Sequence, residues 1–140
     1  MQIDFSHETT LRVRYGETDQ MGYCYYGNYA QYFEVGRVEA LRAIGMSYKS
    51  LEASGVMLPV SEFQVKYKAP AKYDDALTIK TQISESRGSR LIFDYTILNE
   101  ENVLIAEAST TLVFVSKDHM KPIQAPDKFK ELMKKYEAKD

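Results

Sequence analysis

The chain has 140 residues, of which 44% are hydrophobic and 27% charged, ordinary values for a soluble globular protein. Its net charge of −2, without a block of like charge, argues against a nucleic-acid or anionic-membrane partner. No apolar run approaches the roughly 20 residues that span a bilayer, and the first residues lack the basic and apolar regions of a signal peptide, so we expect a cytoplasmic protein.

The first regular elements along the chain are a strand and a long helix. Thr9–Tyr15 alternates apolar and basic residues, which is typical of a half-buried strand. The helix is expected to begin near residues 26–28, where Asn28 and Gln31 resemble a capping box, and to end at Gly45. A stripe at helical spacing is expected to be mostly core: Tyr29, Tyr32, Phe33, Gly36, Ala40, Leu41 and Ile44.

Gly36 stands in the middle of this helix, where a glycine costs about 1 kcal/mol relative to alanine. Its presence suggests that another element approaches the helix closely at this point. A strongly curved sheet wrapped around the helix would require such an approach.

Beyond the helix the chain is mostly β structure. Met46–Gly55 is expected to add a helical turn or two, and Asp127–Glu137 a short closing helix. Four segments between them are predicted as strands separated by turn sequences: Val60–Lys68, Ala76–Ser84, Arg90–Leu98 and Val103–Val115. Because short connections favour antiparallel neighbours, we predict an α+β fold, with one helix against one antiparallel sheet, in a single domain of residues 1–140.

The segment between the first strand and the helix fits no regular element. Residues 16–29, GETDQMGYCYYGNY, combine three glycines, several tyrosines, two carboxylates and the only cysteine. With one cysteine, neither an internal disulfide nor a cysteine-based zinc site can form, and we expect Cys24 to be a small buried residue. His7 and His119 are far apart in sequence without ligand spacing, so we expect both on the surface and no metal site.

The longer segment RYGETDQMGYCYYGNYAQYFEVGR, residues 14–37, resembles the signature of hotdog-fold thioesterases of the 4-hydroxybenzoyl-CoA thioesterase family. The shared pattern is an acid-Thr-Asp loop, a glycine three residues after the Asp, and Asn-Tyr opening a helix that continues with aromatics, Glu and Arg. The later strand order agrees as well, so the resemblance covers roughly residues 8–120. It implies a hotdog fold, with a curved antiparallel sheet of about five strands wrapped around one long helix.

The resemblance also implies roles for three residues. Asp19 takes the place of the family's catalytic aspartate, acting as nucleophile or general base. Tyr26 takes the place of the residue at the helix start whose backbone N–H polarises the thioester carbonyl, and with Gly27 it is expected to bind substrate. Tyrosine here matches the hydroxybenzoyl-CoA branch, but that branch often has proline where this chain has Gly27, so the resemblance does not carry over the substrate's identity.

Elementary chemistry agrees with these roles. The oxygen of a thioester carbonyl becomes negative when the carbon is attacked, and a helix N-terminus offers unpaired N–H groups and a favourable dipole. A nearby carboxylate can attack directly or activate water. A thiolate leaves readily, so we expect no cofactor or metal, with CoA present only as part of the substrate.

Other roles compete for the same residues. An aspartate in a glycine-rich loop is commonly a turn former, so Asp19 could serve only the turn. Glu17 could be a second carboxylate, although a solvated or ion-paired role is favoured. Glu34 matches an acidic position of the family pattern, and could either orient the loop or form a surface ion pair with Arg37.

Arg87 and Arg90 are candidates for binding substrate phosphates, and an open sheet edge is a candidate for binding a second subunit. Arg87 and Arg90 flank a tight turn and could simply be solvated, but the resemblance implies that basic residues at this hairpin contact the CoA phosphates. In the resembling fold two sheets join edge to edge, which would pair an otherwise open edge strand. We therefore expect a homodimer or homotetramer.

The leading hypothesis is an acyl-CoA thioesterase that releases a free acid and CoA. An acyl-ACP thioesterase using the same site, and a non-catalytic acyl-thioester binding protein, remain alternatives. Retention of Asp19 in its full loop favours an enzyme, and the absence of an Asp-x-x-x-x-His pair disfavours a hydratase of the same fold.

Overall fold

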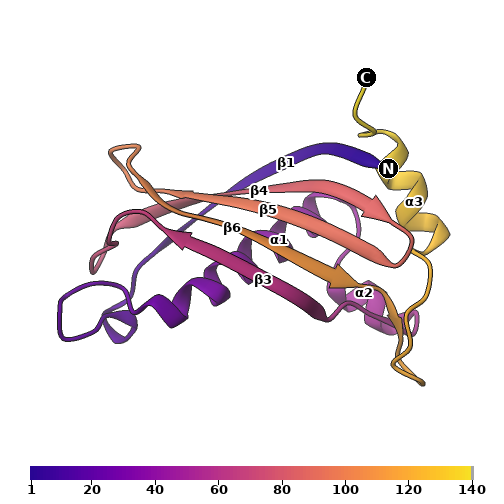
Figure 1. Ribbon diagram of the computed structural model, residues 1–140, viewed down its shortest axis with the longest axis horizontal. Coiled ribbons are helices and arrows are strands. Elements are labelled where there is room, and N and C mark those ends of the chain that lie inside the picture. Colours follow the sequence, from indigo (N-terminus) through magenta and orange to yellow (C-terminus); the bar gives the residue numbers. More distant parts are fainter. Residues whose placement is uncertain (140) are drawn as a thin grey trace.

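A curved five-stranded antiparallel sheet and one long helix form the body of the molecule (Figure 1). The computed structural model describes residues 1–139. The strand order is β1-β4-β5-β6-β3, and every neighbouring pair is antiparallel. The strands are β1 (Gln2–Arg12), β3 (Val60–Tyr67), β4 (Ala76–Arg87), β5 (Arg90–Leu98) and β6 (Leu104–Val113). The predicted α+β arrangement is therefore confirmed.

Helix α1 (Tyr29–Ile44) crosses one face of the sheet and buries the predicted stripe (Figure 1). It follows a 3₁₀ turn at Tyr26–Asn28 and ends at Gly45, whose φ of 102° is the left-handed conformation that glycine favours. The sequence predicted both of these ends correctly. The core between helix and sheet is rich in aromatic and aliphatic side chains, among them Phe33, Phe93, Leu41, Leu77, Ile79 and Ile97.

The close approach expected at Gly36 occurs against strand β4. A Cβ atom on Gly36 would lie 2.4 Å from Thr81 Oγ1 and 2.8 Å from Ile79 Cγ2. No side chain fits in that space, so glycine is required for the helix to reach the sheet. The prediction made from a single mid-helix glycine is confirmed.

Smaller elements surround this body. Helix α2 (Tyr48–Ala53) and helix α3 (Asp127–Lys134) occupy the two predicted helical segments, and β2 (Val56–Met57) pairs with β7 (Val115–Ser116). Among residues 1–139, no helix is both long and apolar enough to cross a membrane. The same residues contain no group of three or more His, Cys, Asp or Glu side chains that could hold a metal ion.

The first strand was predicted incorrectly. We expected Thr9–Tyr15, whereas β1 occupies Gln2–Arg12 and the chain leaves the sheet before a 3₁₀ turn at Tyr15–Glu17. Tyr15 is 77% exposed instead of buried. An edge strand buries little, so the polar side chains that alternate along QIDFSHE hid its first half.

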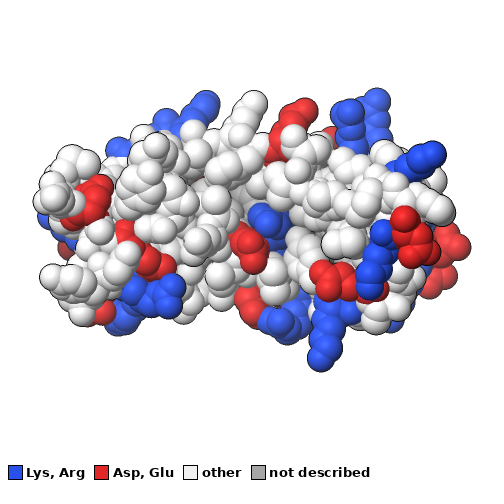
Figure 2. Space-filling view, turned by 90° about the horizontal axis from the view of Figure 1, so that it is seen from below, with Lys and Arg blue, Asp and Glu red and all other residues white. Residues whose placement is uncertain are grey.

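The two edges of the sheet differ. At the start of β1 the edge is covered by the C-terminal segment, because Asp4 N donates to Tyr136 O and Ala138 N donates to Gln2 O. The other edge, β3, is exposed along almost its whole length and lies free in Figure 1. Seen from below, charged side chains form small mixed groups with wide uncharged areas between them (Figure 2).

Candidate active site

The loop between β1 and α1 is tightly folded. Asp19 N donates to Tyr23 O at 2.8 Å, and Gly22 N donates to Asp19 O at 3.0 Å. Gly22 has a φ of +81°, a conformation that side chains with a Cβ rarely adopt. The glycine three residues after the aspartate is therefore a requirement of the turn.

The Asp19 side chain has two different oxygens. Oδ1 accepts from Met21 N at 2.9 Å and from Tyr23 N at 3.3 Å, which is the geometry of a turn-forming aspartate. Oδ2 accepts no hydrogen bond among the described residues. The turn therefore fixes the carboxylate but uses only one of its oxygens, so structural and chemical roles are compatible in the same residue.

Asp19 lines a cavity of about 340 Å³ beside the start of the helix. Four of its ten lining residues are tyrosines, Tyr23, Tyr26, Tyr29 and Tyr67, which come from the loop, α1 and β3, and Lys68 and Pro70 come from the segment after β3. The Tyr67 ring contacts the rings of Tyr26 and Tyr29, and Tyr25, which does not line the cavity, packs against Tyr26. Tyrosines of the loop, of α1 and of β3 thus form one side of the cavity through edge-on ring contacts.

The start of the helix offers free backbone donors next to this cavity. Neither Tyr26 N nor Gly27 N donates to an acceptor within residues 1–139. A Cβ on Gly27 would lie 2.6 Å from Cε2 of Tyr25, so glycine lets this ring pack against the turn. Tyr67 donates from its hydroxyl to Tyr26 O at 3.2 Å and ties the turn to β3. The two amides are therefore held in place and available.

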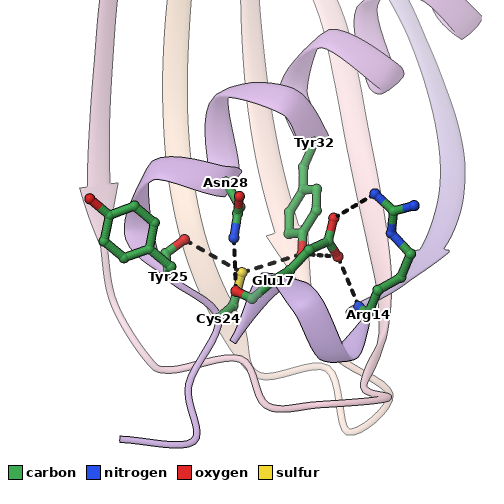
Figure 3. A network of polar contacts seen from close by, with 6 residues as sticks. All are labelled: Arg14, Glu17, Cys24, Tyr25, Asn28 and Tyr32. Carbon is green, nitrogen blue, oxygen red and sulfur yellow. Dashed lines mark hydrogen bonds and ion pairs between the residues drawn. The ribbon is translucent and has the colours of Figure 1, made fainter. Parts of the chain in front are cut away.

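Glu17 anchors the loop through its contacts with Arg14 and Tyr32 (Figure 3). Its side chain accepts from Arg14 N at 2.8 Å, from Arg14 Nη2 at 3.2 Å and from the Tyr32 hydroxyl at 2.9 Å. Burial raises the pKa of Glu17, but the amide of Arg14, the Tyr32 hydroxyl and the Arg14 guanidinium together outweigh it and lower this pKa below its ordinary value. Of the roles considered for Glu17, ion pairing is the one observed, although the side chain is only 9% exposed.

The backbone of Glu17 also fixes the start of the helix. Its carbonyl accepts from Tyr25 N at 2.8 Å and from Asn28 Nδ2 at 2.8 Å. The capping box expected at Asn28 and Gln31 is therefore wrong, since the Asn28 side chain makes no cap hydrogen bond. Asn28 is at the N-cap of α1, but its backbone is already helical at the end of the 3₁₀ turn, and its side chain donates to the loop instead.

Cys24 is buried, as predicted, and forms part of the same cluster. Its Sγ lies 3.3 Å from the Tyr32 hydroxyl, and burial raises the pKa of the thiol. Burial also raises the pKa of Tyr32. Both groups therefore stay neutral near pH 7, and the thiol is a packing residue without thiolate character.

Comparison with known proteins identifies the family. Residues 13–133 match the model described as the Thioesterase-like superfamily. The chain belongs to this superfamily. It is 40% identical over 116 residues to the acyl-CoA thioester hydrolase YbgC of Escherichia coli O6:H1, covering 83% of this chain and 87% of that protein.

Two further relatives extend the comparison. A DHNA-CoA thioesterase structure from Staphylococcus aureus has a TM-score of 0.90 and 34% identity, covering 94% of this chain and 90% of that one. The acyl-acyl carrier protein thioesterase ATL3 of Arabidopsis thaliana is 33% identical over 123 residues, covering 86% of this chain and 63% of that protein. The expected hotdog thioesterase fold is confirmed, and the protein is a thioesterase.

The structure of this thioesterase brings some predicted site residues together and separates others. Asp19 and Tyr26 line one cavity, with Gly27 in the adjoining turn. Arg87 and Arg90 lie on the β4–β5 hairpin, which is at the opposite end of the sheet from the loop (Figure 1). Within one chain they are therefore not part of the Asp19 cavity.

Two smaller expectations need correction, and two cavity residues were missed. Among residues 1–139 the Glu34 side chain forms neither a hydrogen bond to the loop nor an ion pair with Arg37, which is buried and donates to tyrosine hydroxyls instead. His119 is exposed as expected, but His7 is half-buried and its Nδ1 is sealed from solvent without a partner among the described residues. The sequence also missed Tyr67 and Lys68 as cavity residues, since only the pairing of β3 in the sheet brings them near Asp19.

Proposed function

We propose that this thioesterase hydrolyses acyl-CoA thioesters at the Asp19 cavity. The observation that carries the proposal is that Asp19, whose Oδ2 accepts no hydrogen bond within residues 1–139, lines one cavity with Tyr26, and that the backbone amides of Tyr26 and the adjoining Gly27 are unpaired in the same residues. A basic or nucleophilic oxygen and an oxyanion-stabilising pair are the two groups that thioester cleavage requires. The relative YbgC, named for acyl-CoA thioester hydrolysis, supports the same substrate class.

In the general-base route, Asp19 Oδ2 takes a proton from water while the water oxygen bonds to the carbonyl carbon. The carbonyl oxygen gains negative charge and accepts from the Tyr26 amide, with Gly27 as a second donor. The C–S bond then breaks, the C=O bond re-forms, and the thiolate of CoA leaves and takes up a proton. A nucleophilic route instead bonds Oδ2 to the carbonyl carbon and breaks the C–S bond, so that the CoA thiolate leaves and takes up a proton; water then hydrolyses the mixed anhydride, which releases the acid and restores the Asp19 carboxylate.

These two routes predict different fates for oxygen. In a single turnover in isotopically labelled water with enzyme in excess, the nucleophilic route transfers label to the Asp19 carboxylate if water attacks its carbonyl. The general-base route labels only the released acid. Neither route uses a resident cofactor, and CoA takes part only as the leaving group of the substrate.

The carrier of the acyl group has a second candidate. The relative ATL3 is named for acyl groups carried on acyl carrier protein, so an acyl-ACP substrate is the alternative. Both carriers present the acyl group through a thioester, and the Asp19 cavity would serve either one. Thiol release should be compared for matched acyl groups on CoA and on acyl carrier protein.

The assay has a defined outcome for each hypothesis. Faster release from CoA supports the proposal, and faster release from acyl carrier protein supports the alternative. Tight binding of thioesters without any release would instead indicate a binding protein and contradict both.

For assembly we propose a homodimer joined through β3, or a tetramer built from such dimers. The support is that β3 is the open edge and carries exposed apolar side chains, Val60, Phe63 and Tyr67, at 46%, 41% and 47% exposure. Unpaired edge strands of this kind are usually covered in soluble proteins. Light scattering at assay concentration should give at least twice the monomer mass, and a stable monomer would contradict this assembly.

We further propose that Arg87 and Arg90 contact the CoA phosphates of a site completed by another subunit, in a cytoplasmic enzyme. Both arginines line an open cavity of about 550 Å³. Replacing both with alanine should raise KM for acyl-CoA and reduce its salt dependence, while an N-acetylcysteamine thioester, which lacks the phosphates, should be little affected. Equal losses with the two substrates would indicate a structural defect instead.

A further inference from the structure

A second cavity, of about 290 Å³, lies between α1 and the open edge strand β3. Its apolar wall includes Ala30, Val60 and Phe63. Its polar wall includes Glu34 and Arg37 of α1, with Thr110 of β6. No residue of this cavity has a role in the steps of thioester cleavage given above.

Arg37 is the unusual member of this wall. The side chain is only 8% exposed, yet it forms no ion pair with a carboxylate anywhere in residues 1–139. Its Nε donates to the Tyr48 hydroxyl at 3.1 Å and its Nη1 donates to the Tyr95 hydroxyl at 3.3 Å. The Tyr95 hydroxyl in turn lies 2.6 Å from Thr110 Oγ1.

The guanidinium retains donors for which no protein acceptor is recorded. Nη2 donates to nothing among the described residues, and it is not one of their buried atoms that are sealed without a partner. It is therefore not sealed from solvent, and Arg37 is one of the residues that line the second cavity. Neutral hydroxyls orient a buried guanidinium without neutralising its charge, so strong donors remain at a cavity with a partly apolar wall.

This second cavity and the Asp19 cavity lie along the same two elements. Tyr29 and Tyr67 wall the Asp19 cavity, while Arg37 and Phe63 wall the second one. In both cases one residue comes from α1 and the other from β3. Arg37 lies two turns beyond Tyr29, about 12 Å along the axis at about 1.5 Å per residue. A substrate that occupies both cavities would therefore extend about 12 Å along the helix, with its thioester at Asp19 and its far end at Arg37.

We propose that Arg37 selects acyl groups that carry an oxygen acceptor far from the thioester, binding that oxygen through Nη2. This inference rests on the proposed thioesterase function and adds the substrate class. A hydroxyl and a carboxylate share the required acceptor oxygen. Glu34 lines the same wall and favours a hydroxyl, because its carboxylate can accept a hydrogen bond from a hydroxyl but repels a second carboxylate.

The test uses three CoA thioesters of equal chain length: decanoyl, ω-hydroxydecanoyl and sebacyl. For the wild-type protein, kcat/KM for at least one oxygenated substrate should exceed that for decanoyl-CoA by about 10-fold or more, the scale of a hydrogen bond to a charged group. Equal values, or a preference for decanoyl-CoA, would overturn the inference. Failure to hydrolyse any thioester would instead contradict the proposed function.

The variant Arg37→Met keeps the length of the side chain and removes its charge and donors. It should lose the preference for the oxygenated substrate through KM while retaining decanoyl-CoA hydrolysis. The matched control is Arg42→Met, which removes an exposed arginine of the same helix that pairs with Glu39. This control should keep the wild-type preference, and an equal loss in both variants would contradict a specific role for Arg37.

Arg37 is buried, so Arg37→Met could fail to fold, and a second variant decides the matter in that case. Glu34→Gln removes a negative charge at an exposed position that lines the same cavity as Arg37. If Arg37 faces the bound oxygen, this change should raise kcat/KM for sebacyl-CoA relative to ω-hydroxydecanoyl-CoA by about 3-fold or more, since one like charge is removed. An unchanged ratio would overturn the inference.

Discussion

Glu17 and Asp19 are two carboxylates on one loop, only two residues apart, with opposite surroundings. Glu17 is 9% exposed, and both of its carboxylate oxygens accept hydrogen bonds, from Arg14 and Tyr32. Asp19 is more exposed and lines a cavity; one of its oxygens accepts from loop amides, and the other accepts no hydrogen bond within residues 1–139. Both carboxylate oxygens of Glu17 are hydrogen-bonded within the structure, whereas only one oxygen of Asp19 is.

The difference shows how the loop combines rigidity with a reactive group. A catalytic carboxylate must be held in place without losing its accessible oxygen. Glu17 meets the first need, because its side chain and carbonyl tie the loop to α1 and to the 3₁₀ turn beside the free amides (Figure 3). Asp19 can then keep one oxygen unpaired. Substitutions at the two positions should therefore separate stability from chemistry.

The largest effect is expected for Asp19→Asn. Asparagine keeps a side-chain oxygen for Met21 N and Tyr23 N, so the turn and the melting temperature should change little. It is a poor base and a poor nucleophile, so kcat should fall by about 100-fold or more. Steady-state kinetics with an acyl-CoA, together with thermal unfolding, measures both quantities on one preparation.

The reverse result would reassign the site. If Asp19→Asn kept most of its activity while Glu17→Gln lost it without a loss of stability, the catalytic acid would be Glu17. The cavity would then have to be reached by a carboxylate that the present structure holds between Arg14 and Tyr32.

Glu17→Gln is expected to act mainly on stability. Glutamine keeps the size of the side chain but loses the charge that its donors stabilise, and its amide nitrogen cannot accept from Arg14 or Tyr32. Loss of a buried charge-assisted hydrogen bond costs about 1–3 kcal/mol in the free energy of unfolding. Denaturant unfolding measures this, and kcat of the folded fraction should fall by less than for Asp19→Asn.

A smaller effect is expected for Tyr32→Phe. This change removes the hydroxyl that bridges Glu17 and Cys24 and leaves the buried ring in place. The free energy of unfolding should fall by about 1–2 kcal/mol, because Glu17 keeps its Arg14 partners. The matched control is Tyr23→Phe, whose exposed hydroxyl makes no hydrogen bond within residues 1–139, and which should be as stable as wild type.

Strand prediction was most accurate where buried and exposed side chains alternate regularly along the strand. Arg90–Leu98 was predicted with the bounds of β5, because its alternation is regular and its flanking turn is distinct. The edge strand β1 was half missed, since polar residues fill its exposed positions. Gly36 was informative because a glycine inside a helix is costly unless another element needs the space.

Only the site residues that lie close together in the sequence were predicted. Asp19 and Tyr26 belong to one continuous loop motif, so spacing alone placed them together. The burial of Glu17 depends on the Tyr32 hydroxyl, which the helix presents from its core-facing side. The spacing of Tyr32 in the helix predicts that its ring is buried, but it does not predict that its hydroxyl points toward the loop. For the same reason the burial of Arg37, considered only as a surface partner of Glu34, was not predicted.

The smallest expected effect is the pH dependence of the Glu17 contribution. Because the folded state lowers the pKa of Glu17 from its ordinary value of 4.5, the stabilisation is fully present above that value and is lost as the pH falls through the lowered pKa. Unfolding of wild type and Glu17→Gln should be compared between about pH 7 and about pH 3. The gap in stability should be constant near neutrality and should narrow below pH 4.5. A gap that widens on acidification would mean that the folded protein prefers the protonated acid, which would contradict the ion pair with Arg14.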